Sequence, residues 1–139
     1  MDTLNQNINL KLATWLFALC IMIVAMIFIG GVTRLTGSGL SMVEWRPFLG
    51  FLPPLTETEW TRVFELYKLS PEFKQINSWM EISDFKFIFF WEYFHRVWGR
   101  LIGLFILIPF LYFIVTKKLK NKILFRSSII LFLVCIQGL

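Results

Sequence analysis

The residues best suited to chemistry lie in one stretch, Trp91 to Gly103, in the second half of the chain. Its polar and small positions recur at helical spacing. At 100° per residue, these positions fall within roughly a 100° arc of one helix face: Glu92, His95, Arg96, Gly99 and Gly103. Ionisable groups in an apolar segment each cost up to about 3 kcal/mol on insertion scales. Such residues normally face a bundle interior and act there.

His95 is the only histidine in the chain. A neutral imidazole is an axial ligand for haem iron, among other metals. Glu92 precedes it by one turn on the same face, close enough to orient the imidazole or to handle a proton. This pair predicts a metal or haem site, with His95 as the iron ligand and Glu92 as the reactive or orienting carboxylate.

The neighbouring residues suit a porphyrin. Arg96 and Arg100 can hold its propionates, because a guanidinium binds carboxylates with two parallel hydrogen bonds. Gly99 and Gly103 form a small-xxx-small pair, which lets another helix or a flat macrocycle approach the backbone.

A structural interpretation of the same residues stays open. Glu92 and Arg96 can form a neutral i,i+4 salt bridge, with His95 hydrogen-bonded across the bundle. The two glycines can serve packing alone. A di-iron site would need carboxylates from other helices, and a zinc-protease helix would need a second histidine in His-Glu-x-x-His spacing.

The elements that carry these residues are membrane spans. The chain is 57% hydrophobic and 18% aromatic. Its apolar residues are gathered in blocks, and a lipid-spanning helix needs about 20 of them in succession. We predict an all-α, polytopic transmembrane bundle with two complete spans, at about 12–33 and 87–115, and a partial third at 123–139. The first block is too long for the core of a signal peptide, so we expect it to be retained.

The charge pattern predicts orientation. The net charge of +5 comes from a basic cluster between the second and third spans, which holds Lys117, Lys118, Lys120, Lys122 and Arg126 without an acidic residue. By the positive-inside rule this loop and the N-terminus are cytoplasmic, and segment 34–86 faces outward. The excess charge is therefore a topology signal, and we expect no nucleic-acid partner.

Local signals subdivide the outer segment. Thr56 and Glu59 are spaced as a capping box, and apolar residues follow at helical spacing from Trp60 to Tyr67. This amphipathic helix could lie at the membrane surface or cover a site. Ser70-Pro71 predicts a second short helix, and Ser83 is the predicted N-cap of the second span.

The glycine-rich run after the first span and the two cysteines are interpreted as structural features. The run from Gly30 to Met42 is rich in glycine, and Gly30-Gly31 can end the first helix or allow a close backbone approach. Cys20 and Cys135 both fall inside apolar blocks, so we expect packing residues and no disulfide.

Three segments together resemble the haem A synthase family: Gly30 to Met42, Gly50 to Thr56, and Glu92-Tyr93-Phe94-His95-Arg96-Val97-Trp98-Gly99-Arg100. The similarity is to the long-loop branch of mitochondria and alphaproteobacteria, and it covers the chain from about residue 15 onward. It implies an eight-span bundle of two four-helix halves, of which this chain is the first part.

The resemblance also implies a function. The family oxidises the C8 methyl of haem O to the formyl group of haem A, for cytochrome oxidase assembly. His95 then corresponds to a haem-ligating histidine and Glu92 to the acidic residue implicated in the reaction. A haem b cofactor is expected mainly in the second half. The implied partners are the lipid bilayer, the remaining helices, haem O synthase and oxidase assembly factors, in a bacterial inner membrane.

One axial ligand and two and a half helices cannot enclose a porphyrin, so we expect these 139 residues alone to be inactive. The alternative is a non-catalytic membrane protein, either a b-type haem-binding protein or a degenerate remnant.

Overall fold

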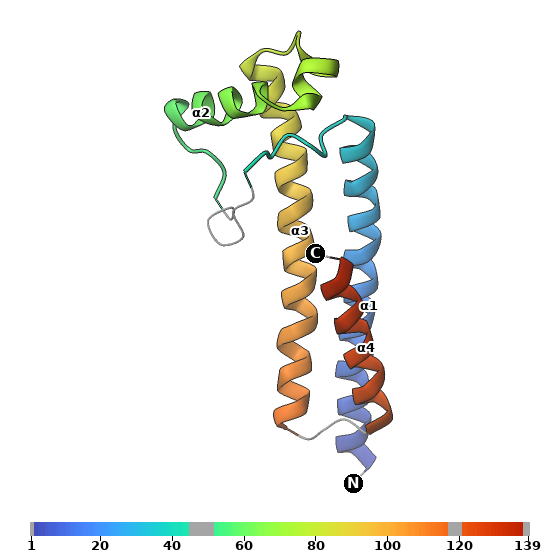
Figure 1. The fold of residues 1–139 in the computed structure, drawn as a ribbon. Helices are drawn as coiled ribbons and strands as arrows, with labels where there is room; N and C mark the ends of the chain where they lie inside the picture. The colour runs from blue at the N-terminus through green and yellow to red at the C-terminus, as the bar shows by residue number, and fades with distance from the viewer. Residues whose placement is uncertain (1, 45–51, 117–120, 138–139) are drawn as a thin grey trace. The chain divides into compact units, whose positions relative to one another are not determined.

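The computed structural model describes residues 2–44, 52–116 and 121–137, with side chains for 10–44, 52–116 and 122–136. Its described elements are all helical: α1 (Asp2–Leu35), α2 (Glu57–Lys68), the π-helix η1 (Phe73–Asn77), α3 (Ile82–Val115) and α4 (Asn121–Gln137) (Figure 1). The stretches Leu10–Leu35 and Ile82–Val115 are long and apolar enough to cross a membrane. The predicted all-α fold with two long apolar spans is confirmed. Gly50, Phe51 and the predicted basic residues Lys117, Lys118 and Lys120 lie outside the described residues.

The chain forms two compact units. Unit 1 consists of residues 1–26 and 98–139, and unit 2 of residues 27–97. Both boundaries fall inside long helices, so α1 and α3 each contribute to both units.

Unit 1 is held together by apolar packing. Leu19, Ile102 and Ile106 are buried at its centre. Methionines and aromatic residues of α1 and α3 and two residues of α4 pack around them: Met22, Met26, Trp98, Phe105, Leu131 and Val134. Gly99 belongs to this packing, because a Cβ there would lie 3.4 Å from Met26 Cε.

Pro109 interrupts the hydrogen bonding of α3. Proline has no N–H, so it leaves the carbonyl four residues earlier, at Phe105, without its helical donor. Trp15 Nε1 donates to this carbonyl at 2.9 Å. A lipid environment offers no water to replace a missing donor. The indole of α1 therefore satisfies the one α3 carbonyl that Pro109 orphans.

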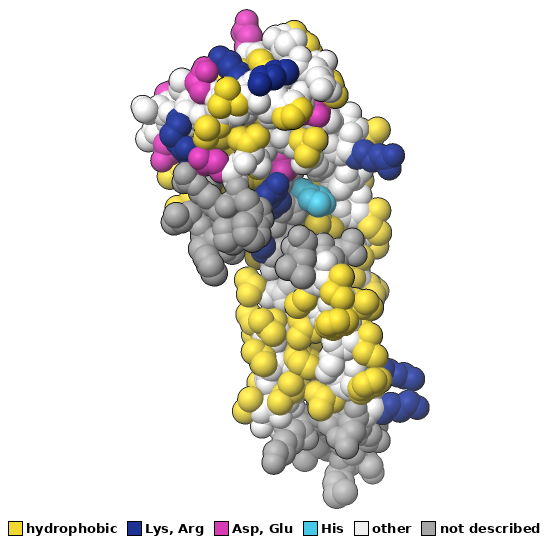
Figure 2. Space-filling view, viewed as in Figure 1, with side chains coloured by type: hydrophobic (Ala, Val, Ile, Leu, Met, Phe, Trp, Pro, Cys, Tyr) yellow, Lys and Arg dark blue, Asp and Glu magenta, His cyan; other side chains and the backbone are white. Residues whose placement is uncertain are grey.

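The outer surface of unit 1 is apolar. Exposed large hydrophobic residues include Phe17, Val24, Ile108 and Phe132, each more than 60% exposed. Hydrophobic side chains cover much of this part of the chain in Figure 2. Cys20 and Cys135 are free thiols and are also exposed, so the prediction that they are packing residues is wrong within this chain, while the absence of a disulfide between them agrees with it.

In unit 2, α1 continues through Gly30 and Gly31 and ends at Leu35, so these glycines do not end the helix. Gly37 ends it, with a positive φ of 64°. Gly37 N donates to Arg34 O at 3.2 Å and Ser38 N donates to Thr33 O at 2.9 Å. These two bonds make a Schellman motif, which favours glycine at the left-handed position.

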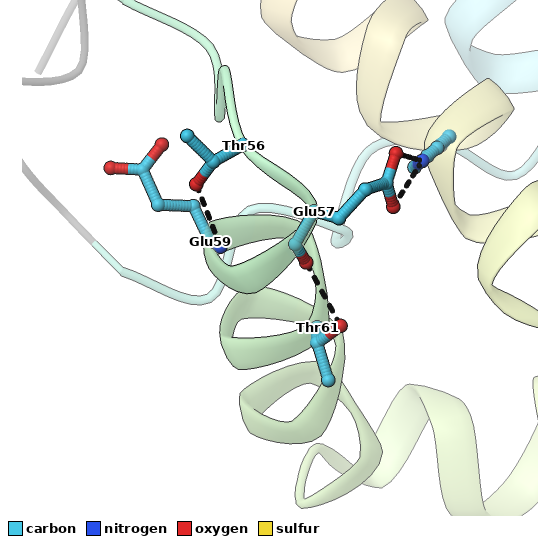
Figure 3. A network of polar contacts seen from close by, with 5 residues as sticks. Thr56, Glu57, Glu59 and Thr61 are labelled. Carbon is cyan, nitrogen blue, oxygen red and sulfur yellow. Dashed lines mark hydrogen bonds and ion pairs between the residues drawn. The ribbon is translucent and has the colours of Figure 1, made fainter.

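The start of α2 agrees with the predicted capping signal. Thr56 is the N-cap, and its side chain accepts a hydrogen bond from Glu59 N at 3.2 Å (Figure 3). The Glu59 carboxylate, however, accepts from Leu55 N at 3.0 Å, one residue before the N-cap that a capping box would use. Glu57 pairs with Lys86 at 2.8 Å and so ties the start of α2 to α3.

The apolar face of α2 packs on the first turns of α3. Val63, Phe64 and Tyr67 are buried together with Phe85, Ile88 and Phe89. The rings of Tyr67 and Phe85 stack with centroids 5.0 Å apart. The aromatic residues of the predicted amphipathic helix thus form the core of unit 2, which the sequence had not resolved.

Two predicted helix starts have different outcomes. Ser70 Oγ accepts from Phe73 N at 3.2 Å and opens the short helical segment that becomes η1, as predicted. Ser83 is not an N-cap, because α3 begins at Ile82. Asp84 instead accepts from Glu81 N at 3.1 Å, so the carboxylate in the first turn replaces the predicted hydroxyl.

Candidate functional site

Glu92 lies in the part of α3 that belongs to unit 2, and only 3% of it is exposed. Its Oε2 accepts from Ser41 Oγ at 2.7 Å and from Met42 N at 2.8 Å. Its Oε1 accepts from Arg96 Nη2, the residue one helical turn later. A buried carboxylate is tolerated when it is hydrogen-bonded and paired, and this one has three donors.

Two of these donors come from the glycine- and serine-rich segment that follows α1. Ser38 and Ser41 are 0% and 1% exposed. Thr36 and Ser38 share a short hydroxyl contact, and Thr36 also donates to Val32 O at 2.8 Å. The segment therefore turns back and binds α3 through Glu92. Small side chains permit this close approach.

His95 lies one turn after Glu92 and is half-buried. Within the described residues, its imidazole forms no hydrogen bond or ion pair, so Glu92 does not orient it directly. The imidazole lies against α1: a Cβ on Gly30 would be 3.4 Å from Nε2 and 3.7 Å from Cδ2. The close approach predicted for the glycine pair occurs at Gly30, whereas a Cβ at Gly31 would meet nothing within 4 Å.

An open hollow of about 390 Å³ lies beside His95. Its lining comes from the end of α1, the turn after it, the segment before η1, and α3: Gly30, Thr33, Arg34, Gly37, Gly39, Leu40, Glu72 and His95. The Thr33 hydroxyl already donates to Ile29 O at 2.9 Å. The hollow therefore offers an imidazole, one cation and one carboxylate to a ligand. Figure 2 shows the histidine side chain (cyan) reaching the surface near basic and acidic groups.

The predicted site residues divide between the two units. Glu92, His95 and Arg96 belong to unit 2, whereas Gly99, Arg100 and Gly103 belong to unit 1. The Glu92–Arg96 salt bridge of the structural interpretation is present. Gly99 faces Met26, and a Cβ on Gly103 would meet nothing within 4 Å.

Sequence reasoning gave Gly30 only as a possible close backbone approach, and it did not assign four further residues to the site: Arg34, Ser41, Met42 and Glu72. The signal that could have found most of them is the run of small polar residues after α1. Such residues are unnecessary for a simple turn, and here they let the backbone reach the buried carboxylate.

A comparison with models of protein families shows to which family the chain belongs. Residues 13–139 match the model of the COX15-CtaA family, described as cytochrome oxidase assembly proteins. The chain belongs to this family. The match covers all but the first three residues of the span Leu10–Leu35, the whole of Ile82–Val115 and every residue of the site, and it makes this chain part of a polytopic membrane protein.

Curated relatives in the COX15-CtaA family carry the name haem A synthase. The chain is 48% identical over 127 residues to the Nitrosospira multiformis protein, covering 91% of this chain and 36% of the relative. It is 49% identical over 124 residues to the Rickettsia felis protein, covering 89% and 37%. A haem A synthase–mitochondrial ferredoxin fusion protein of Schizosaccharomyces pombe is 51% identical over 128 residues, covering 92% of this chain and 21% of the fusion.

The chain thus spans little more than a third of the length of the bacterial relatives. No solved structure matches it.

Proposed function

We propose that this chain is the N-terminal part of a haem A synthase, which oxidises the C8 methyl of haem O to the formyl group of haem A for cytochrome oxidase. The observation that carries the proposal is the arrangement in unit 2. A half-buried histidine without a hydrogen bond to any described residue lines an open hollow, one turn from a carboxylate held by three donors. The names of the relatives support the same activity.

The residues of the hollow fit a haem. An imidazole ligates iron through a ring nitrogen, and His95 lines the hollow, with a Cβ on Gly30 lying 3.4 Å from its Nε2. A volume of about 390 Å³ lies within the range of ligand pockets, and this hollow is open, so it can take one edge of a larger group. Haem O would supply both the iron that His95 binds and the methyl group that is oxidised.

Glu92 has an acid–base or orienting role in this proposal. Ser41 donates to its Oε2 and can accept a hydrogen bond from a further donor, since a hydroxyl both donates and accepts. Arg96 is held by Glu92, which fixes the guanidinium on the same face as His95. Gly99, Arg100 and Gly103 remain proposed contacts for the macrocycle and its propionates.

The setting of the enzyme is also a proposal. The charge pattern favours a cytoplasmic N-terminus and an outward-facing 34–86 segment, in a bacterial inner membrane. The remaining helices of the full-length protein would complete the haem enclosure and carry the haem b cofactor. Haem O synthase and oxidase assembly factors are the proposed partners.

The test uses the complete reading frame, expressed in a host that makes haem O but no haem A. Membrane haems are extracted and separated by chromatography. We expect haem A with the wild-type protein and strongly reduced haem A with Glu92→Ala at unchanged protein level. Haem O alone, with the wild-type protein present in the membrane, would contradict the enzyme assignment and favour a non-catalytic haem-binding role.

A further inference from the structure

Arg34 lies in the last turn of α1, one turn after Gly30. Gly30, Thr33 and Arg34 are spaced i, i+3 and i+4, so they share a helix face, and all three line the hollow that contains His95. The residue also marks the end of the apolar span, where the chain enters its outer segment. A cation is thus placed at the water-facing rim of the proposed haem site.

Arg34 differs from the other arginines of unit 2 with described side chains. Arg62 is paired with Glu44, and Arg96 with Glu92. Arg34 is exposed and makes no ion pair or hydrogen bond through its side chain with any described residue, Glu72 of the same hollow included. Its five N–H donors are therefore available to a ligand.

A guanidinium recognises a carboxylate through two parallel charge-assisted hydrogen bonds. Haem carries its two carboxylates on one edge, and His95, the proposed iron ligand, lines the same hollow as Arg34. Arg96, which the sequence singled out for this task, is already engaged by Glu92. Among the described residues that line the hollow, Arg34 is the cation whose side chain has no partner, so it can bind an incoming anion.

We propose that Arg34 binds a propionate of the haem that His95 ligates. This inference rests on the proposed haem-binding function. A basic residue in the last helical turn also interacts favourably with the helix dipole and stabilises the helix. The test must therefore separate this stabilising role from propionate binding. The interaction with the dipole changes helix stability and does not depend on the carboxylates of the ligand.

The experiment titrates the full-length, detergent-solubilised protein with haem as the free diacid and as its dimethyl ester, which removes both carboxylate charges. We expect the wild-type protein to prefer the diacid, and Arg34→Gln to weaken diacid binding by about tenfold, the scale of one lost charge-assisted contact. Ester binding should stay nearly unchanged. Arg34→Lys keeps the charge without the bidentate geometry, so its affinity for the diacid should lie between those of the wild type and Arg34→Gln.

Two control variants make the result specific. Arg62→Gln removes an exposed arginine of the same unit that does not line the hollow, and it should leave the diacid-to-ester ratio unchanged. His95→Ala defines the binding that belongs to other haem sites of the full-length protein. The unfolding temperature of each variant shows whether Arg34 acts on stability alone.

The outcomes separate the inference from the proposed function. His95-dependent binding with the same diacid-to-ester ratio in wild type and Arg34→Gln would overturn the role of Arg34 and leave the haem site intact. Absence of any His95-dependent binding would overturn both.

Discussion

The two units of this chain use polar groups in opposite ways. In unit 1 two polar contacts between helices each join an indole to a backbone carbonyl: Trp15 donates to Phe105 O and Trp98 to Met22 O. In unit 2 an ionised side chain, Glu92, collects three donors from two different segments. The two contacts in unit 1 satisfy backbone carbonyls, whereas those in unit 2 hold the buried carboxylate of Glu92.

This difference indicates where the chemistry lies. The many exposed hydrophobic residues of unit 1 suit contact with lipid and with neighbouring helices. A buried carboxylate costs free energy that packing alone would not require. We therefore propose that the buried carboxylate of unit 2, one turn from the only histidine, serves function, and the variants described below test this contrast.

The largest effect is expected at the paired glycines of α1. Gly30→Val places methyl groups against His95 Nε2, because even a Cβ there would lie 3.4 Å from this nitrogen. Overpacking typically costs about 1–3 kcal/mol, so we expect haem affinity of the full-length protein to fall by about tenfold or more. The measurement is an optical haem titration.

Gly31→Val is the matched control for this substitution. It introduces the same side chain one residue later, where a Cβ meets nothing within 4 Å. The two variants change helix propensity equally, so only contact with the imidazole differs. Equal haem affinity in both variants would refute the assigned role of Gly30.

A smaller effect is expected in unit 1, at the carbonyl that Pro109 orphans. Trp15→Phe removes its donor and should lower the free energy of unfolding by roughly 0.5–2 kcal/mol, the scale of interhelical hydrogen bonds in membrane proteins. Haem affinity should not change, since the contact lies outside the site.

The background variant Pro109→Ala sharpens this test. Alanine restores an N–H that can donate to Phe105 O, so Trp15→Phe should cost less in that background. A double-mutant cycle in mixed micelles measures the difference. Identical costs in both backgrounds would show that the indole acts only through packing.

The smallest effect concerns the aromatic core of unit 2. Burial raises the pKa of Tyr67, although the hydrogen bond from Asn77 at 2.8 Å opposes this shift. The unfolded chain then loses the phenolic proton first, above its ordinary pKa of about 10. The unfolded state binds fewer protons there, so Tyr67 contributes stability below about pH 10 and loses it as the pH rises further.

Tyr67→Phe removes the titrating group and is the reference for this prediction. We expect the stability of the wild type to fall relative to this variant as the pH rises above about 10, measured by thermal unfolding. Parallel pH profiles for the two proteins would contradict the assignment.

Much of the fold could be predicted from sequence because its signals are local. The apolar blocks gave the spans, Thr56 gave the start of α2, and the spacing from Trp60 to Tyr67 gave its buried face. The position of Ser83 misled, because a first-turn carboxylate at Asp84 served the same purpose. The sequence does not show whether Ser83 or Asp84 binds a backbone N–H at the start of α3. The path of the preceding loop determines which of the two does so.

The site was only partly predictable for a different reason. The helical period identified Glu92, His95 and Arg96 as one group and predicted the Glu92–Arg96 pair. Ser41 and Met42 reach Glu92 from about fifty residues away, and no periodic pattern reports such a contact. The missing imidazole–carboxylate bond follows from the same contacts, which draw Glu92 toward the segment after α1.

The central claim is that His95 holds the haem that is modified. The most direct measurement is the haem O content per protein of the purified full-length chain, wild type against His95→Ala, from a host that makes haem O and no haem A. Haem b retained elsewhere in the protein is quantified in the same chromatogram. We expect His95→Ala to lose haem O while the protein stays in the membrane and keeps its haem b. Unchanged haem O content in His95→Ala would contradict it.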